Sequence, residues 1–176
     1  MNAFDPGTPA GFCGIAATAG LAVWPLFRTR GVMLATQLAA LALLSLHYAL
    51  LGVTTAAIVN GLGALQLMAC LAFGTHPRLR MLGYGLAGLM IALSIVTWQG
   101  LISLLSTTGN VVIAIGRLQV KADRMRLLVL AGTPFWILHD LIIASPVVLA
   151  DTLCLLVGLA ALLWRNGGTQ RPARQF

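Results

Sequence analysis

A few polar side chains stand alone inside long apolar stretches of this chain. Asn60, Asn110 and Asp151 each lie in a segment made mainly of Leu, Ala, Val, Ile and Gly. Amides donate and accept hydrogen bonds and a carboxylate accepts several, so these groups can bind a polar solute. We predict that they line a central cavity, with Trp136 placed to stack on a ligand. The alternative is that the polar groups only join helices through hydrogen bonds and that Trp136 packs in the core.

Two histidines add a second possibility for chemistry. His47 in SLHYALLG and His139 in ILHDLIIA are 92 residues apart in the sequence. Because an imidazole titrates near neutral pH, the two histidines and Asp151 could carry protons through the protein. The alternative is a neutral histidine that donates a hydrogen bond to a neighbouring carbonyl. The sequence leaves both alternatives open.

Other chemistries find little support. The three cysteines, Cys13, Cys70 and Cys154, lie in apolar stretches without metal-ligand spacing, and we expect them at helix contacts. No nucleophile–base motif is present, so we expect no enzymatic activity, no cofactor and no metal. The net charge is +7, but the basic residues come in small groups between apolar runs, which argues against nucleic acid as a partner.

Composition indicates the setting of these polar groups. The chain is 59% hydrophobic and 9% charged, against about 25% charged residues in a soluble domain. This is too little polar surface to cover a water-soluble globule, and it predicts an integral membrane protein. The N-terminus lacks the basic region of a signal peptide, so we expect the first apolar segment to be retained as a span.

Hydropathy predicts seven spans. Residues 10–27 fit one span, and three longer uncharged or nearly uncharged segments each fit two, with turns near 52–55, 98–100 and 144–146. Seven spans place all 11 Lys and Arg residues on one side, whereas six or eight spans lose this separation. The N-terminus is therefore expected outside and the C-terminus in the cytoplasm. Near predicted span ends, three tryptophans are expected as interfacial anchors: Trp24, Trp98 and Trp164.

The polar groups also indicate an internal repeat. Each histidine is followed by a turn and then by a polar residue in the next span, Asn60 or, with one residue skipped, Asp151. We predict an all-α polytopic membrane protein made of two parallel three-helix repeats, residues 10–73 and 101–164. A linker helix, 81–97, joins them, and a basic cytoplasmic tail, 165–176, follows. One face of the fifth span is polar along its length, at Ser103, Thr107, Asn110 and Arg117, with Ala114 between them.

Short motifs carry a resemblance. The stretch LFRTRGVMLATQ, then LHYALLG, then a small-residue segment with Asn60, resembles the YgjV-like bacterial inner-membrane proteins. WILHDL, then Asp151, then LLVGLAALLWR, is similar to the second half of that family. The resemblance implies a multi-pass protein of the bacterial inner membrane. The 3+1+3 layout is also similar to that of SWEET and PQ-loop transporters.

In SWEET transporters, asparagines on the third and seventh helices face the substrate, and these positions correspond to Asn60 and Asp151 here. The chain departs from that pattern: it has no Pro-Gln motif, only Pro25 and Pro134 lie within spans, and an acid stands for the second asparagine. These departures argue against assuming a sugar as the substrate.

Two functions follow as hypotheses. The first is a small-solute transporter with alternating access between two three-helix halves, whose partners are the lipid bilayer and a small polar solute. The second is a non-transporting membrane protein, such as an assembly factor, a sensor or a partner subunit. The sequence does not decide the oligomeric state, and a homo-oligomer is among the alternatives.

Overall fold

The computed structural model describes residues 7–52, 54–72, 77–96, 98, 100–142 and 148–168. These residues form seven α-helices and one short 3₁₀ helix, with no strand among them, as an all-α membrane protein requires. The number of helices equals the number of predicted spans. The elements are α1 (Pro9–Val23), η1 (Trp24–Leu26), α2 (Arg30–Leu50), α3 (Thr54–Ala72), α4 (Pro77–Val96), α5 (Leu101–Arg117), α6 (Ala122–Ile142) and α7 (Val148–Gly168).

Local sequence explains where several helices begin and end. The Thr8 hydroxyl accepts a hydrogen bond from the Gly11 N–H at 3.0 Å, and Pro9 fits the first helical position, so α1 begins there. The α2–α3 turn contains Gly52 at φ 76° and α5 starts after Gly100 at φ 73°, a left-handed region that glycine adopts without steric cost. The turns predicted near 52–55 and 98–100 are therefore confirmed. The turn predicted at 144–146 lies outside the described residues.

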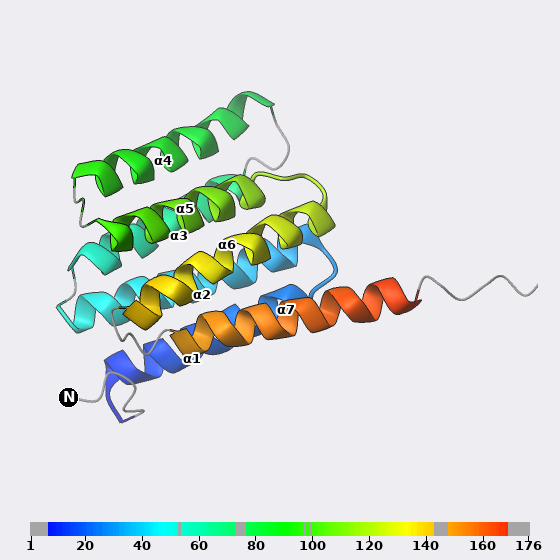
Figure 1. The fold of residues 1–176 in the computed structure, drawn as a ribbon, viewed down its shortest axis with the longest axis horizontal. Helices are drawn as coiled ribbons and strands as arrows, with labels where there is room; N and C mark the ends of the chain where they lie inside the picture. Colours follow the sequence, from blue (N-terminus) through cyan, green and yellow to red (C-terminus); the bar gives the residue numbers. More distant parts are fainter. Residues whose placement is uncertain are drawn as a thin grey trace, which may run out of the picture.

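The helices lie side by side in two layers (Figure 1). In one layer α2 packs against both α1 and α3, and in the other α6 packs against both α5 and α7. The layers meet where α7 packs against α1, and α4 contacts α3 and α5 at the opposite edge. Figure 1 shows the η1–α2 and α5–α6 connections and the last turn of α7 at one end of the bundle. We call this the basic end, because Arg28, Arg30 and Lys121 lie there.

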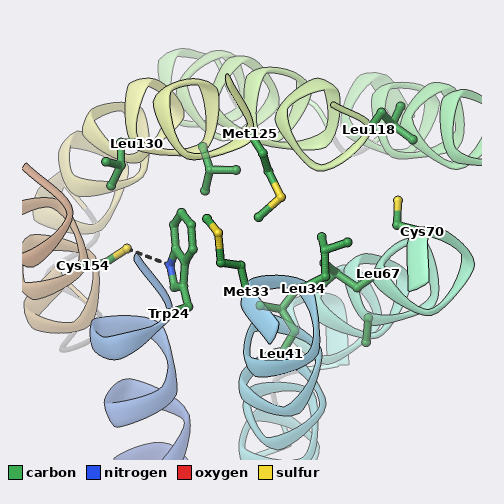
Figure 2. Close-up of a cluster of buried hydrophobic side chains, with 12 residues drawn as sticks. Trp24, Met33, Leu34, Leu41, Leu67, Cys70, Leu118, Met125, Leu130 and Cys154 are labelled. Atoms are coloured by element: carbon green, nitrogen blue, oxygen red, sulfur yellow. Dashed lines mark hydrogen bonds between the residues drawn. The ribbon is translucent and has the colours of Figure 1, made fainter. Parts of the chain in front are cut away.

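A cluster of buried apolar side chains joins the layers near the basic end. Met33 of α2 lies between Trp24 and Met125 of α6 (Figure 2). The Trp24 indole N–H donates to the Cys154 sulfur of α7 at 3.1 Å. Trp24 is only 1% exposed, so its prediction as an interfacial anchor is wrong. The chain turns at Pro25, the indole points into the bundle, and the thiol satisfies its N–H.

The outer surface of the bundle is apolar, as a lipid-facing surface must be. Exposed large side chains include Phe12, Leu89, Leu138 and Leu163, and also Trp98 and Trp164, whose role as interfacial anchors stays a prediction. Two stretches, Pro9–Leu26 and Arg30–Leu50, are long and apolar enough to cross a membrane, and four shorter apolar helices accompany them. The three cysteines are buried and free, as expected for residues at helix contacts.

The predicted boundaries differ slightly from the helices. The helix predicted as a linker from residue 81 begins earlier, at Pro77. At the C-terminus, α7 continues to Gly168, so the first four residues of the predicted tail are helical. Residues 169–176 lie outside the described residues.

Candidate functional site

A cavity of about 120 Å³ lies inside the bundle, and residues of all seven α-helices line it. All four side chains predicted to bind a solute are among them: Asn60 of α3, Asn110 of α5, Trp136 of α6 and Asp151 of α7. They are far apart in the sequence and come from both layers. The structure therefore brings together the residues that the sequence singled out.

Helical spacing explains how these side chains reach one space. Asn60 is followed one turn later by Gly63 and Asp151 by Cys154, and all four line the cavity. Residues three apart share a helix face. On α5, Asn110 and Arg117 are seven residues apart and both line it, so the polar face predicted for this helix points inward.

The two histidines lie outside the cavity lining. His47 is buried at 1% exposure, and its Nδ1 lies 2.8 Å from the carbonyl oxygen of Ala10 in α1. Because a carbonyl only accepts, this nitrogen donates, which favours the structural alternative for His47. His139 is half-buried, and its ring meets Trp136 edge to face at 5.1 Å between centroids. His139 therefore stands next to a cavity residue, whereas His47 joins α1 to α2.

Two further polar residues line the cavity, and sequence reasoning did not assign them to it. Gln37 of α2 is 1% exposed and Arg117 of α5 is 8% exposed. The sequence does contain a signal for Gln37, because it is an isolated amide on the helix face that also carries Leu41, Leu44 and Tyr48. All three of these residues line the cavity. The spacing places Arg117 on the polar face of the fifth span, but its charge also makes it one of the 11 Lys and Arg residues that predict the orientation.

Arg117 and Gln37 form a buried pair. The Arg117 Nε donates to Gln37 Oε1 at 3.2 Å. Gln37 Nε2 is buried and has no hydrogen-bond partner among the described residues. A Cβ added to Gly63 would lie 3.5 Å from Arg117 Nη1, so the guanidinium lies over the bare backbone of α3 at this point. The pair thus lies beside a cavity that Asp151 also lines.

Two arginines fasten the layers to each other at the basic end. Arg30 of α2 donates from Nε to the Gln119 carbonyl at 2.7 Å and from Nη2 to the Arg117 carbonyl at 3.1 Å. These carbonyls lie at the C-terminus of α5, where helical carbonyls lack partners within the helix.

Arg126 of α6 makes the reciprocal contact. It donates from Nε to the Pro25 carbonyl at 3.0 Å and from Nη2 to the Phe27 carbonyl at 2.8 Å, at the end of η1. Its Nη1 also donates to Asp123 at 2.8 Å. We call the contacts of Arg30 and Arg126 the arginine clamps. Arg117 and Arg126 are both buried, and each has hydrogen-bond acceptors that compensate its desolvation.

Among the described residues, no group of three His, Cys, Asp or Glu side chains is placed to hold a metal ion. The cavity instead combines one carboxylate, one guanidinium, three amides and two indoles. Such a set can bind a small polar solute through hydrogen bonds, charge and stacking.

Comparison with protein-family models identifies the family of this chain. The model of the Imp-YgjV family, described as a bacterial inner membrane protein, matches residues 11–170. The chain is a member of the YgjV family. No curated protein and no solved structure matched. The match spans all seven helices, so the YgjV family description applies to the whole bundle, and the protein is a multi-pass protein of the bacterial inner membrane.

Proposed function

We propose that this YgjV-family protein is a small-solute transporter that binds its substrate in the central cavity. The observation that carries the proposal is the polar cavity lined by all seven α-helices, including Asn60, Asn110 and Asp151. Polar and ionisable groups inside a membrane are costly and commonly mark a solute or ion pathway. A protein that only needed helix contacts would gain little from keeping these groups around an open space.

The cavity lining supports a two-fold repeat. His47 and His139 are 92 residues apart, and the offset becomes 91 after the skipped residue. At these offsets, many lining residues of the first half have an equivalent lining residue in the second half. The pairs are Leu21 with Ile113, Gln37 with Val129, Leu41 with Thr133, Leu44 with Trp136, Asn60 with Asp151, and Gly63 with Cys154. A cavity built from equivalent positions lies at the interface of the repeats, where transporters of repeated architecture place their substrate.

The arginine clamps supply a gate for alternating access. The carbonyls that Arg126 binds, Pro25 and Phe27, stand 92 residues before those that Arg30 binds, Arg117 and Gln119. An arginine of each half therefore donates to backbone carbonyls at equivalent positions of the other half. If the halves rock against each other as rigid bodies, these bonds break and the basic end opens. The cavity residues keep their positions within each half.

Cavity size limits the substrate in this conformation. A cavity of about 150 Å³ holds one benzene molecule, so about 120 Å³ holds a solute of roughly five non-hydrogen atoms. A hexose has more than twice as many atoms and does not fit this state. The proposed substrate is smaller than the sugars that SWEET transporters carry.

The experiment is uptake of small sugars, amino acids and organic acids into proteoliposomes. We compare wild type with Asn60→Ala and Asp151→Asn, and use Thr108→Ala as the control. The Thr108 hydroxyl bonds the Leu104 carbonyl at the exposed side of α5, away from the cavity. Uptake that both cavity variants abolish, and that Thr108→Ala retains, would establish the transporter.

Two outcomes would contradict the proposal. If folded wild-type protein takes up none of the solutes, the transporter proposal fails and the alternative of a sensor, assembly factor or partner subunit takes its place. If uptake occurs but is unchanged in Asn60→Ala and Asp151→Asn, the cavity is not the substrate site.

A further inference from the structure

The chemistry of the Arg117–Gln37 pair narrows the class of solute. An arginine side chain only donates hydrogen bonds, so the oxygen of Gln37 must face it, and the amide NH₂ must point elsewhere. The structure has this arrangement: Arg117 Nε donates to Gln37 Oε1, and Gln37 Nε2 is buried without a partner among the described residues. A buried donor without an acceptor destabilises the protein, and a bound acceptor would remove that cost.

Arg117 offers further donors at the same place. A guanidinium carries five N–H groups, and the structure gives the Arg117 side chain one hydrogen bond, from Nε, within the described part of the chain. The four N–H groups on its two Nη atoms remain available. Arg117 and Gln37 both line the cavity, and a small shift of the buried Gln37 amide would bring its unused donor to the same space as those of Arg117.

The matching ligand group is an oxyanion. A planar guanidinium binds a carboxylate through two parallel hydrogen bonds, and an adjacent amide NH₂ adds a third donor. Gly63 leaves room beside this pair, since a Cβ there would lie 2.6 Å from Leu41 Cδ2, too close for both. We infer that the cavity binds a short carboxylate solute whose carboxylate is held by Arg117 and Gln37 Nε2.

The rest of the lining suits the remainder of such a solute. Asp151 and Asn60 can accept a hydrogen bond from an amine or hydroxyl next to the carboxylate, and Trp24 and Trp136 provide apolar walls. Acetate, lactate and alanine have between four and six non-hydrogen atoms and match the volume of about 120 Å³. The inference rests on the proposed function only in making this ligand a transported substrate, because binding itself is measured without transport.

The test measures binding to purified protein in detergent. The thermal unfolding midpoint is followed against increasing acetate, lactate or alanine, with ionic strength held constant by chloride, and against acetamide and lactamide as neutral analogues. We expect at least one carboxylate to raise the midpoint in a saturable way, and its matched amide to leave it unchanged. Comparing alanine with lactate tells whether the neighbouring group is an amine or a hydroxyl.

Gln37→Glu is the decisive variant. The new carboxylate would pair with Arg117 inside the protein, which preserves the fold but fills the anion site with a tethered anion. We expect carboxylate affinity to fall at least tenfold while the midpoint without ligand is retained or raised. If Gln37→Glu binds carboxylates as wild type does, the inference is overturned.

A matched pair of variants controls for loss of a buried amide. Gln66 is also fully buried, donates from Nε2 to the Gly83 carbonyl at 3.3 Å, and does not line the cavity. Gln37→Met should weaken carboxylate binding about tenfold, the loss of one charge-assisted bond, whereas Gln66→Met should not. Equal losses in both variants would overturn the inference.

The two proposals fail in different ways. Uptake of a neutral solute by protein that binds no carboxylate would overturn this inference and leave the transporter intact. Saturable carboxylate binding that Gln37→Glu removes, with no uptake of any solute, would support the anion site and remove the transporter.

Discussion

At the residue scale, the cavity shows how a few polar groups are placed in an apolar chain. Asn60, Asn110 and Asp151 face an open space, and Gln37 and Arg117 bond to each other beside it. His47 is different, because it is buried against the Ala10 carbonyl and does not line the cavity. Similar polar side chains thus divide between a cavity and helix contacts, and burial alone does not separate the two.

His47 provides a prediction about stability. His47→Leu removes the donor to the Ala10 carbonyl, and we expect the free energy of unfolding in detergent to fall by about 0.6–1.7 kcal/mol, the average and the maximum for hydrogen bonds between membrane helices. Chemical unfolding followed by circular dichroism checks this. Uptake by the folded variant should keep the wild-type pH dependence between pH 5.5 and 8. Loss of that dependence would instead support a proton relay through His47.

Gly63 provides a prediction about cavity space. In Gly63→Ala the new Cβ would lie 2.6 Å from Leu41 Cδ2, so Leu41, which lines the cavity, must shift, while Arg117 Nη1 at 3.5 Å stays at van der Waals distance. We expect overpacking to cost about 1–3 kcal/mol of stability and carboxylate affinity to fall about tenfold. Gly61→Ala is the control on the same helix, because its nearest contact is Ser45 Oγ at 3.4 Å. Equal effects of the two substitutions would contradict the assignment.

At the element scale, the arginine clamps connect helix ends across the layers. Helix C-termini leave carbonyls without partners, and an arginine beside them both donates hydrogen bonds and complements the helix dipole. Arg30 and Arg126 do this for α5 and η1 respectively. These contacts lie at helix ends and not along the lengths of packed helices. A rigid movement of one layer can therefore break all of them together.

The clamp can be tested by thiol labelling. Cys70 of α3 is 5% exposed and belongs to the buried cluster near the basic end. Arg30→Ala removes two hydrogen bonds across the layers, and we expect the rate of maleimide labelling of Cys70, resolved by mass spectrometry, to rise about tenfold. Arg28→Ala, at an exposed position two residues away, should leave the rate unchanged. An unchanged rate in Arg30→Ala would show that this clamp does not hold the basic end closed.

At the scale of the whole molecule, the charges predict the orientation in the membrane. Trp98, between α4 and α5, is 55% exposed, and Val120, between α5 and α6, is 50% exposed. We expect an impermeant maleimide added outside intact cells to label Trp98→Cys and not Val120→Cys, because the excess of Lys and Arg predicts that the basic end faces the cytoplasm. Labelling after lysis is the control for both variants. The reverse pattern would invert the orientation.

The sequence by itself determined the class of the protein, the number of helices, two of its turns and four residues that share a cavity. These follow from rules that act locally: lipid requires each backbone group to be satisfied within its own helix, glycine permits positive φ, and polar groups avoid lipid. Hydropathy and spacing carry that information because neighbours along a helix are also neighbours in sequence.

Only the tertiary structure decided which polar groups meet. Arg117 and Gln37 are 80 residues apart, and Arg117 has the same sequence context as the exposed basic residues of the loops. Trp24 likewise has the context of an interfacial anchor, but it is buried against Cys154 of a distant helix. The direction of a long side chain at a helix end depends on what the opposite layer offers, here an amide oxygen and a thiol. That choice is made by packing between layers, which no pattern within a single helix encodes.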